Sequence, residues 1–449
     1  MDFARTILGI PVPRVHAWSS EPTEVGADFI VCEKAPGMDL SQVWAQTGYE
    51  ASHQVFHVSR QINIMEQKFL DNPLSSYGSV FYKKDIGGLH HEPLWPDGRQ
   101  DKASEKFVIG PMMSQDFWRG ERAKMEVDRG PCKRFGIGFT QTMVLIRTSG
   151  KHPATYVSAL IKSEQEWLRR YARPRPTGDQ FIRSDEDNSP GAHIELLDKL
   201  LSVIHALILG AEGSPTLGHP GLEKPNIFVS PTPPHDILGV VGWKTTTVRP
   251  MYLQVKFPKA MQYAGGLFQL NDKTEIPRLP DNFERLSLGE QANLMSHQWQ
   301  AAVHVHHMSL IKKDVRHLMP LTHPYAPLFI HSIFRATRTW EDGMYGLKQA
   351  LALIQFGWDV LADPGIPCPL AFSPEEIKSV EESTKRWEAY DHWVKSLSKE
   401  LGVGCDGIVD DAEEFELVKR KSDEFQRRWD VATMGGPYPF QDGGRSVMV

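Results

Sequence analysis

The chain has 449 residues and a formal net charge of −6, from 50 lysines and arginines against 56 aspartates and glutamates. This balance excludes the basic field that nucleic-acid binding requires, and a hydrophobic share of 41% is enough for a substantial core. Four widely separated cysteines exclude a disulfide framework and a cysteine-based zinc site. The sequence has neither an apolar run long enough to span a membrane nor a signal peptide, so we expect a cytoplasmic protein.

The front of the chain predicts one strand among short helices. Phe3–Leu8 predicts a short helix, and the apolar run at 28–34 predicts a buried β-strand that ends at Ala35-Pro36-Gly37. Apolar residues at helical spacing then predict helices over 40–44 and 55–70. This part of the chain combines a strand with amphipathic helices.

The middle of the chain contains a segment unlike its surroundings. Residues 133–150 are basic and β-prone, and we interpret them as an insert, with a retained intron as the alternative. Helices are predicted on its C-terminal side, over 156–171 and 194–209. Short apolar runs separated by turns over 216–253 predict a pair of strands between two loops.

The remainder of the chain is predicted to be helical, and it ends in a Gly-rich tail that we expect to be loose, residues 434–449. The predicted helices cover 289–307, 340–356, 374–401 and 413–429. The sequence therefore predicts an α+β protein with two parts, a strand-containing front at 1–37 and a mostly helical body at 38–449.

The most informative stretch runs from His219 to Phe228 (HPGLEKPNIF) and continues at 239–244 (GVVGWK). It resembles the catalytic loop, H-P-D-L-H-x-x-N-I-F, and the metal loop, G-I-I-D-W-Q, of the fungal aminoglycoside-phosphotransferase and choline-kinase-like family. Segments that also resemble this family lie at 10–20, 33–37, 110–131 and 246–254. The resemblance implies a protein-kinase-like fold with a truncated N-terminal lobe and a large helical C-terminal lobe.

The same resemblance shows which parts of the phosphotransfer machinery we expect to be lost. Gly221 stands where the family has its proton-accepting aspartate, and Gly242 stands where it has a metal-binding aspartate. Asn226 remains, but one neutral amide does not hold magnesium against water. Met1 matches the helix after the nucleotide-covering strands, so we expect that front to be missing, with a start codon placed too late as the alternative. The sequence therefore predicts no kinase activity and no cofactor.

The altered cleft retains several polar side chains that we take as candidate site residues. Lys244, His219 and Lys224 are the candidate catalytic donors, since each could polarise a carbonyl group. The candidate ligand-binding residues are Glu223, Asn226, Trp243 and Arg249. Three of these candidates also have a plainer interpretation. Lys244 is then a solvated surface lysine and Trp243 a core residue. Asn226 is then a loop cap, since asparagine side chains readily bond to turn backbone.

Three functions are compatible with these residues. The first is an enzyme of fungal secondary metabolism that binds an apolar small molecule and templates a cofactor-free cyclisation, such as an intramolecular Diels–Alder reaction. The second is a pseudokinase that acts as a binding or scaffold protein, and the third is a residual small-molecule phosphotransferase. No sequence feature separates the first two, and the oligomeric state is undetermined.

Two further clusters have plainer interpretations. An aromatic-rich face at 380–394 has the spacing of a helix and is more typical of core than of an interface. Four histidines at 297–307 lack acidic or cysteine partners at ligand spacing, so we expect helix-face residues and no metal site.

Overall fold

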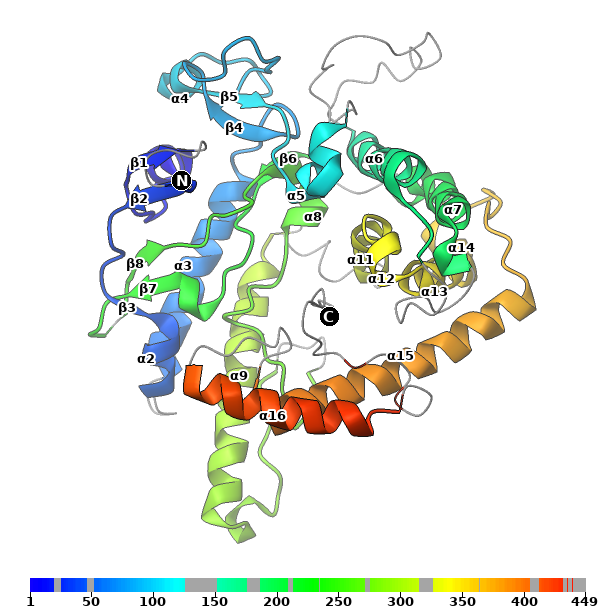
Figure 1. The fold of residues 1–449 in the computed structure, drawn as a ribbon. Helices are drawn as coiled ribbons and strands as arrows, with labels where there is room; N and C mark the ends of the chain where they lie inside the picture. The colour runs from blue at the N-terminus through cyan, green and yellow to red at the C-terminus, as the bar shows by residue number, and fades with distance from the viewer. Residues whose placement is uncertain are drawn as a thin grey trace. The chain divides into compact units, whose positions relative to one another are not determined.

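The computed structural model describes most of the chain, shown in Figure 1. The described residues are 1–19, 26–46, 52–125, 152–175, 186–208, 213–233, 235–270, 275–314, 326–362, 364–403, 412–430, 434 and 438. The predicted insert at 133–150 and nearly all of the predicted tail at 434–449 lie outside them. No helix in these ranges is long and apolar enough to cross a membrane.

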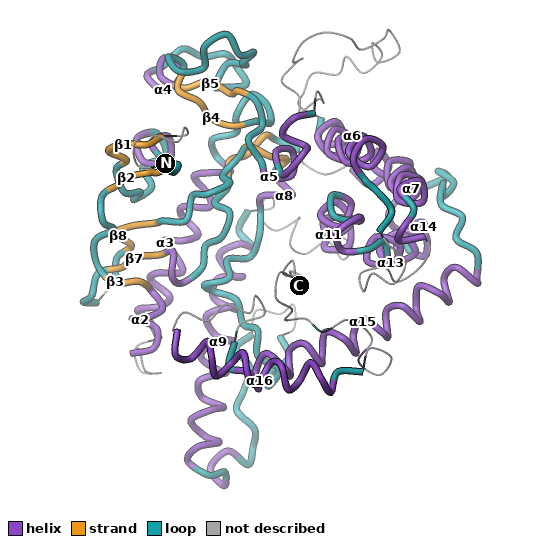
Figure 2. Tube along the Cα trace, in the orientation of Figure 1, coloured by secondary structure: helices purple, strands orange, loops and turns teal. Residues whose placement is uncertain are grey.

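The structure is a mixed α+β protein in which helices outweigh strands, as predicted (Figure 2). The strands are β1 (Val15–Ser19), β2 (Phe29–Cys32), β3 (Met38–Asp39), β4 (Ser79–Tyr82), β5 (Phe107–Gly110), β6 (Pro215–Leu217), β7 (Ile227–Val229), β8 (Ile237–Val240) and β9 (Val248–Pro250). They form three antiparallel pairs, β1–β2, β4–β5 and β6–β9, and a three-stranded sheet of order β3-β7-β8.

The helices follow the predicted positions closely. They are α1 (Asp2–Thr6), α2 (Leu40–Gln46), α3 (Ser52–Leu70), α4 (Lys102–Lys106), α5 (Gln115–Trp118), α6 (Pro153–Tyr171), α7 (Pro190–Ile208), α8 (Met251–Gln254), α9 (Leu288–Ile311), α11 (Ala326–Ala336), α12 (Thr339–Asp342), α13 (Tyr345–Phe356), α14 (Trp358–Leu361), α15 (Pro374–Leu401) and α16 (Ala412–Arg428). The single helix predicted over 340–356 is wrong, because Gly343 adopts a positive φ of 86° and separates α12 from α13.

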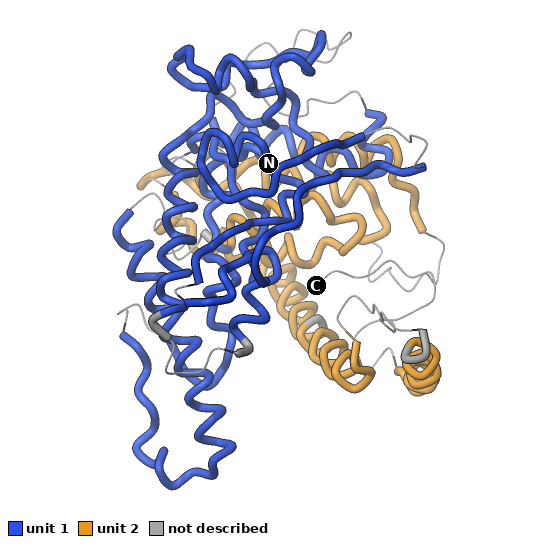
Figure 3. Tube along the Cα trace, turned by 90° about the vertical axis from the view of Figure 1, so that its left-hand side faces the viewer, with its two compact units in different colours: residues 1–160, 210–327 blue, residues 161–209, 328–449 orange. Residues whose placement is uncertain are grey.

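The chain divides into two compact units, coloured separately in Figure 3. The first comprises Met1–Leu160 and Gly210–Pro327, and the second comprises Ile161–Leu209 and Leu328–Val449. Both sides of the predicted boundary at residue 37 lie in the first unit. The reason is that the front is tied to the hairpin of β7 and β8, because the Val240 N–H donates to the Pro11 carbonyl at 2.7 Å.

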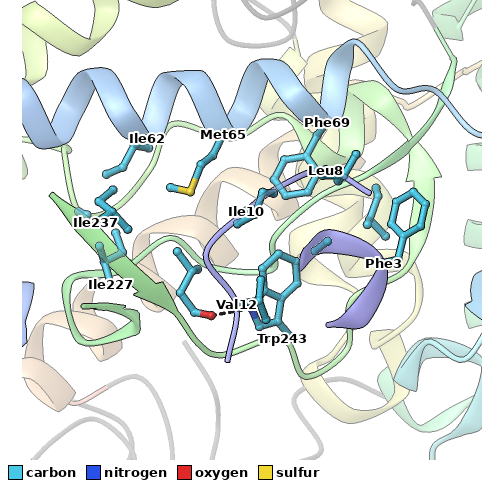
Figure 4. Packing of buried hydrophobic residues seen from close by; sticks show 14 of the residues in the cluster. Phe3, Leu8, Ile10, Val12, Ile62, Met65, Phe69, Ile227, Ile237 and Trp243 are labelled. Atoms are coloured by element: carbon cyan, nitrogen blue, oxygen red, sulfur yellow. Dashed lines mark hydrogen bonds between the residues drawn. The ribbon is translucent and has the colours of Figure 1, made fainter. Parts of the chain in front are cut away.

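The core of the first unit is built around α3. Its apolar face buries Val58, Ile62, Met65 and Phe69, as the spacing predicts, and α9 packs against the same helix. Figure 4 shows this face with Ile227 and Ile237 of the β7–β8 hairpin, Trp243 and the front residues. The loop that follows β8 is therefore anchored to the core.

The predicted strand at 28–34 forms as β2, but the prediction that it is buried is wrong. Ile30 is 64% exposed and Val31 is 50% exposed. The reason is that β2 pairs only with β1 among the described strands, and a two-stranded ribbon has little to cover its faces.

The second unit is helical. Within it α13 contacts α7 and α15, and α15 contacts α16. Val380, Tyr390 and Val394 of α15 are buried, which confirms the core interpretation for these residues, while Trp393 is 38% exposed.

Candidate functional site

Three positions that the sequence singled out lie together after β6 and β8. The segment from His219 to Asn226 connects β6 to β7 and ends in a single 3-10 turn, Lys224–Asn226. The Asn226 side-chain Nδ2 donates to the Gly221 carbonyl at 3.1 Å. A Cβ added at Gly242 would lie 2.8 Å from Asn226 Cγ. Gly221, Asn226 and Gly242 therefore form one cluster, although sixteen residues separate the last two in sequence.

This cluster does not fit a magnesium ion. A hard dication takes several oxygen ligands, usually with at least one carboxylate, and two of the three positions are glycine. Glu223 lies near Gly221 but pairs with Lys259 at 2.6 Å. Across the described ranges, no group of three or more histidine, cysteine, aspartate or glutamate side chains is placed to hold a metal.

His219 is held by the backbone through both of its ring nitrogens. Nε2 lies 2.8 Å from the Val241 carbonyl, and the Gly221 N–H donates to Nδ1 at 3.2 Å. Nε2 must therefore carry the proton, because a carbonyl only accepts. Burial lowers the pKa of His219, which keeps the ring neutral. His219 therefore links the 219–221 segment to Val241, which directly follows β8.

Trp243 is a core residue. It is 8% exposed, its ring meets that of His219 edge to face at 4.7 Å, and its Nε1–H donates to the Val240 carbonyl at 2.8 Å (Figure 4). The positive φ of 83° at Gly242 turns the chain so that Trp243 points into the core. The core interpretation of Trp243 is the one that this geometry supports.

The three basic candidates are dispersed. Lys224 lies over the Trp44 ring, with its Nζ 4.4 Å from the centroid, and burial lowers its pKa. Lys244 is exposed on a turn. Arg249 on β9 donates from NH2 to Ser114 Oγ at 2.9 Å and lies 3.4 Å from an Asp116 carboxylate oxygen. Each cation therefore has its own surroundings, and they do not form one catalytic group.

A pocket lies beside the cluster, bounded by α3, by the segment from 216 to 222 and by the segment from 254 to 259. Its volume is about 190 Å³. Phe69, Leu217 and Phe257 form apolar parts of its wall, and His219 and Gly221 are the predicted site residues that line it. The pocket thus adjoins the cluster from the α3 side.

Three charged residues of this pocket were not singled out in the sequence: Glu66 on α3, and Lys256 and Lys259 after α8. Glu66 follows directly after Met65 of the buried face, and this position could have marked it as a partly buried acid. Burial, with Arg249 and Lys259 nearby, lowers the pKa of Lys256. No sequence pattern marks that lysine, because its place depends on how two distant segments fold together.

The histidines of α9 have separate partners. His297 Nδ1 lies 3.2 Å from the Tyr263 hydroxyl, and His304 Nδ1 accepts from the Tyr263 N–H at 3.3 Å. The His306 ring stacks on Phe56, and His307 is completely buried between α9 and α3. They serve the packing of α9 and do not converge on one point.

Comparisons with known proteins give fungal relatives. Two Aspergillus fumigatus proteins, each named subtelomeric hrmA-associated cluster protein, are 29% identical over 433 residues, which is 91% of this chain and 80% of each relative. A mitochondrial protein of Eremothecium gossypii, named altered inheritance of mitochondria protein 9, is 22% identical over 382 residues, 81% of this chain and 58% of that protein. No family model matches the chain, and no solved structure matches it.

Proposed function

We propose that this chain is a phosphotransferase-like protein that has lost phosphoryl transfer and binds a small molecule beside its former catalytic loop. The observation that carries the proposal is that Gly221 and Gly242 stand where the family that the sequence resembles has its two aspartates. Phosphoryl transfer depends on positioned charge, and neither Gly221 nor Gly242 provides any.

The arrangement of elements supports the kinase-like part of the proposal. A loop containing Asn226 leads into the β7–β8 hairpin, and the next loop brings Gly242 back to Asn226. This is the arrangement that a catalytic loop and a metal loop need if their side chains are to share one ion. The resemblance in sequence and the closeness in space are independent observations, and both point to the same ancestry.

The binding part of the proposal depends on the pocket. Its volume of about 190 Å³ is below the range of about 300–1,000 Å³ that is usual for drug-sized ligands, so it suits a small molecule. The cyclisation hypothesis asks for an apolar small molecule, and only a small one would fit this pocket. Cyclisation remains a prediction for which Lys244, His219 and Lys224 are the residues to test.

The relatives support a role in a fungal gene cluster, since two of them are named for one. Another relative is named as a mitochondrial protein, whereas the sequence of this chain predicts a cytoplasmic one. A role in a cluster is compatible with either compartment.

The test is a phosphate-transfer assay. Purified protein is incubated with magnesium, ATP labelled at the γ-phosphate and a metabolite extract from the fungus that carries the gene. We expect no labelled product above that of a boiled sample. A labelled small molecule that forms in proportion to the amount of protein would contradict the proposal.

A further inference from the structure

The ribbon of β1 and β2 exposes apolar side chains on a strand with an open edge (Figure 1). Trp18 is 55% exposed and pairs across the ribbon with Ile30, and Val31 is half exposed as well. Among the described strands only β1 pairs with β2, so the outer edge of β2 has no partner strand there. The bulge of the ribbon lies in β1, between Val15 and Ala17, and β2 itself carries neither charge nor proline. β2 therefore lacks three features that usually keep an edge strand from pairing.

The backbone of β2 directs alternate residues to this open edge. The Glu33 N–H donates to the Arg14 carbonyl at 2.9 Å, so the backbone groups of Glu33 point toward β1. Because this direction alternates along a strand, the backbone groups of Val31 and Phe29 also point toward β1. The residues whose backbone groups point to the open edge are therefore Asp28, Ile30, Cys32 and Lys34.

We propose that β2 pairs with β2 of a second copy of this chain, antiparallel and across a two-fold axis at Val31. The two ribbons then form one four-stranded sheet, in which each copy contributes the same surface, as is usual in homodimers. Ile30 of each copy lies opposite Cys32 of the other, so the apolar centre of the edge is covered. This dimer goes beyond the proposed function and does not depend on it.

Charge complementarity selects the axis at Val31. In an antiparallel pair, residues that face each other both point their backbone groups into the ladder, so the axis falls on a residue and not between two. Only the axis at Val31 places Asp28 opposite Lys34 of the second copy, and the symmetry forms this pair twice. An axis at Ile30 would place Asp28 opposite Cys32 instead. Asp28 and Lys34 are both exposed, so an acid and a lysine meet at each end of the apolar centre.

The size of this surface sets the strength of the dimer. Two strand edges and a few apolar side chains make an interface at the low end of the range, below about 1,200 Å², where weak complexes lie. We therefore expect a dimer that forms at high protein concentration and dissociates on dilution. Sedimentation equilibrium of the full chain, at concentrations up to about 200 µM, covers the micromolar dissociation constants of this class. A chain that stays monomeric over this range would overturn the proposal.

Disulfide trapping tests the position of the axis. Val31 would lie opposite its own counterpart in a non-hydrogen-bonded pair, with Cα atoms about 4.5 Å apart, a separation that a disulfide can bridge. We expect Val31→Cys, made together with Cys32→Ser, to give a band of twice the mass on a non-reducing gel after mild oxidation. Ala27→Cys with Cys32→Ser is the matched control, since Ala27 is exposed and would lie about 26 Å from its own counterpart. No band from Val31→Cys beyond that of the control would overturn the proposal.

A charge exchange tests the pairing of Asp28 with Lys34. Asp28→Lys and Lys34→Asp each place like charges opposite one another twice, so we expect about tenfold weaker dimerisation in either variant. The double variant exchanges the charges and restores opposite pairs, so its dimer should regain the strength of the unsubstituted chain. Both side chains are exposed, and circular dichroism confirms that the variants are folded. Single variants that dimerise as well as the unsubstituted chain, or a double variant that does not recover, would overturn the register.

Discussion

Glycine at position 242 is required by the local geometry of its loop. Its φ of 83° lies in the left-handed region, and the Asn226 amide occupies the space where a Cβ would be. Asn226 uses that space to reach the Gly221 carbonyl. The conformation of this loop therefore requires glycine at position 242, and an aspartate placed there would have to displace Asn226.

Gly242→Ala tests this fit. We expect a loss of stability of about 1–2 kcal/mol from the left-handed conformation alone, and more from the contact with Asn226. Urea unfolding measures it. In a double-mutant cycle, adding Asn226→Ala should remove the part of the stability loss that comes from the contact with Asn226. The free-energy changes of the two substitutions should therefore not be additive. Additive losses would show that the side chain of Asn226 does not occupy this space.

His219 gives a prediction about pH. Its pKa lies below the ordinary 6.5 because of burial, and burial is also the largest cause of the lowered pKa of His193 and His304. As the pH falls below 6.5, the unfolded chain takes up protons before the folded chain does. Stability is therefore greatest above that pH and decreases toward the folded pKa values.

The measurement is the free energy of unfolding in urea at several pH values between 5 and 8. A difference of one bound proton between the unfolded and the folded chain changes this free energy by about 1.4 kcal/mol per pH unit. His219→Gln offers a side chain that can donate to the Val241 carbonyl and accept from the Gly221 N–H without titrating. We expect the free energy of unfolding of this variant to change less steeply with pH. The slope should be smaller by up to the amount that corresponds to one bound proton. The same slope in both proteins would contradict the assignment to His219.

At the scale of elements, the front is joined to the β7–β8 hairpin by a close backbone approach. Met38 of β3 pairs with Val229 of β7, and a Cβ at the preceding Gly37 would lie 2.2 Å from the Val229 carbonyl oxygen. Only glycine permits this approach at a φ of 86°. Gly37 therefore holds the strand order of this small sheet.

Gly37→Ala should destabilise the first unit by several kcal/mol, because the obstructing atom belongs to the backbone and cannot rotate away. Gly26→Ala is the matched control, since Gly26 has a similar φ of 80° with no atom within 4 Å of the added Cβ. The Gly26→Ala substitution should lower the free energy of unfolding by about 1–2 kcal/mol. Thermal unfolding of both variants gives the comparison, and equal losses would refute the close approach.

The elements also show what the sequence can and cannot predict. The apolar spacing of Val58, Ile62 and Phe69 determines the buried face of α3, so helix and core were both predictable. The break at Gly343 and the exposure of Ile30 were not, since each depends on local turn geometry or on which strands lie alongside. Periodicity describes one element at a time.

For the molecule as a whole, the motif resemblance predicted the cluster of Gly221, Asn226 and Gly242 but not the pocket beside it. A motif identifies positions that lie in one loop. Glu66, Lys256 and His219 line the same pocket only because three distant segments fold together. The division of the chain into two units was equally hidden, because each unit is made of two separate stretches. Contacts between segments that are far apart in the sequence can therefore be identified only from the structure.

The central claim is that this cleft no longer binds magnesium and ATP, and a thermal-shift titration tests it most directly. A nucleotide bound at 100 times its dissociation constant would stabilise the protein by about 2.7 kcal/mol, a readily measured increase in unfolding temperature. We predict no shift on adding millimolar ATP with magnesium beyond that caused by magnesium alone. A saturable stabilisation that requires both would contradict the account.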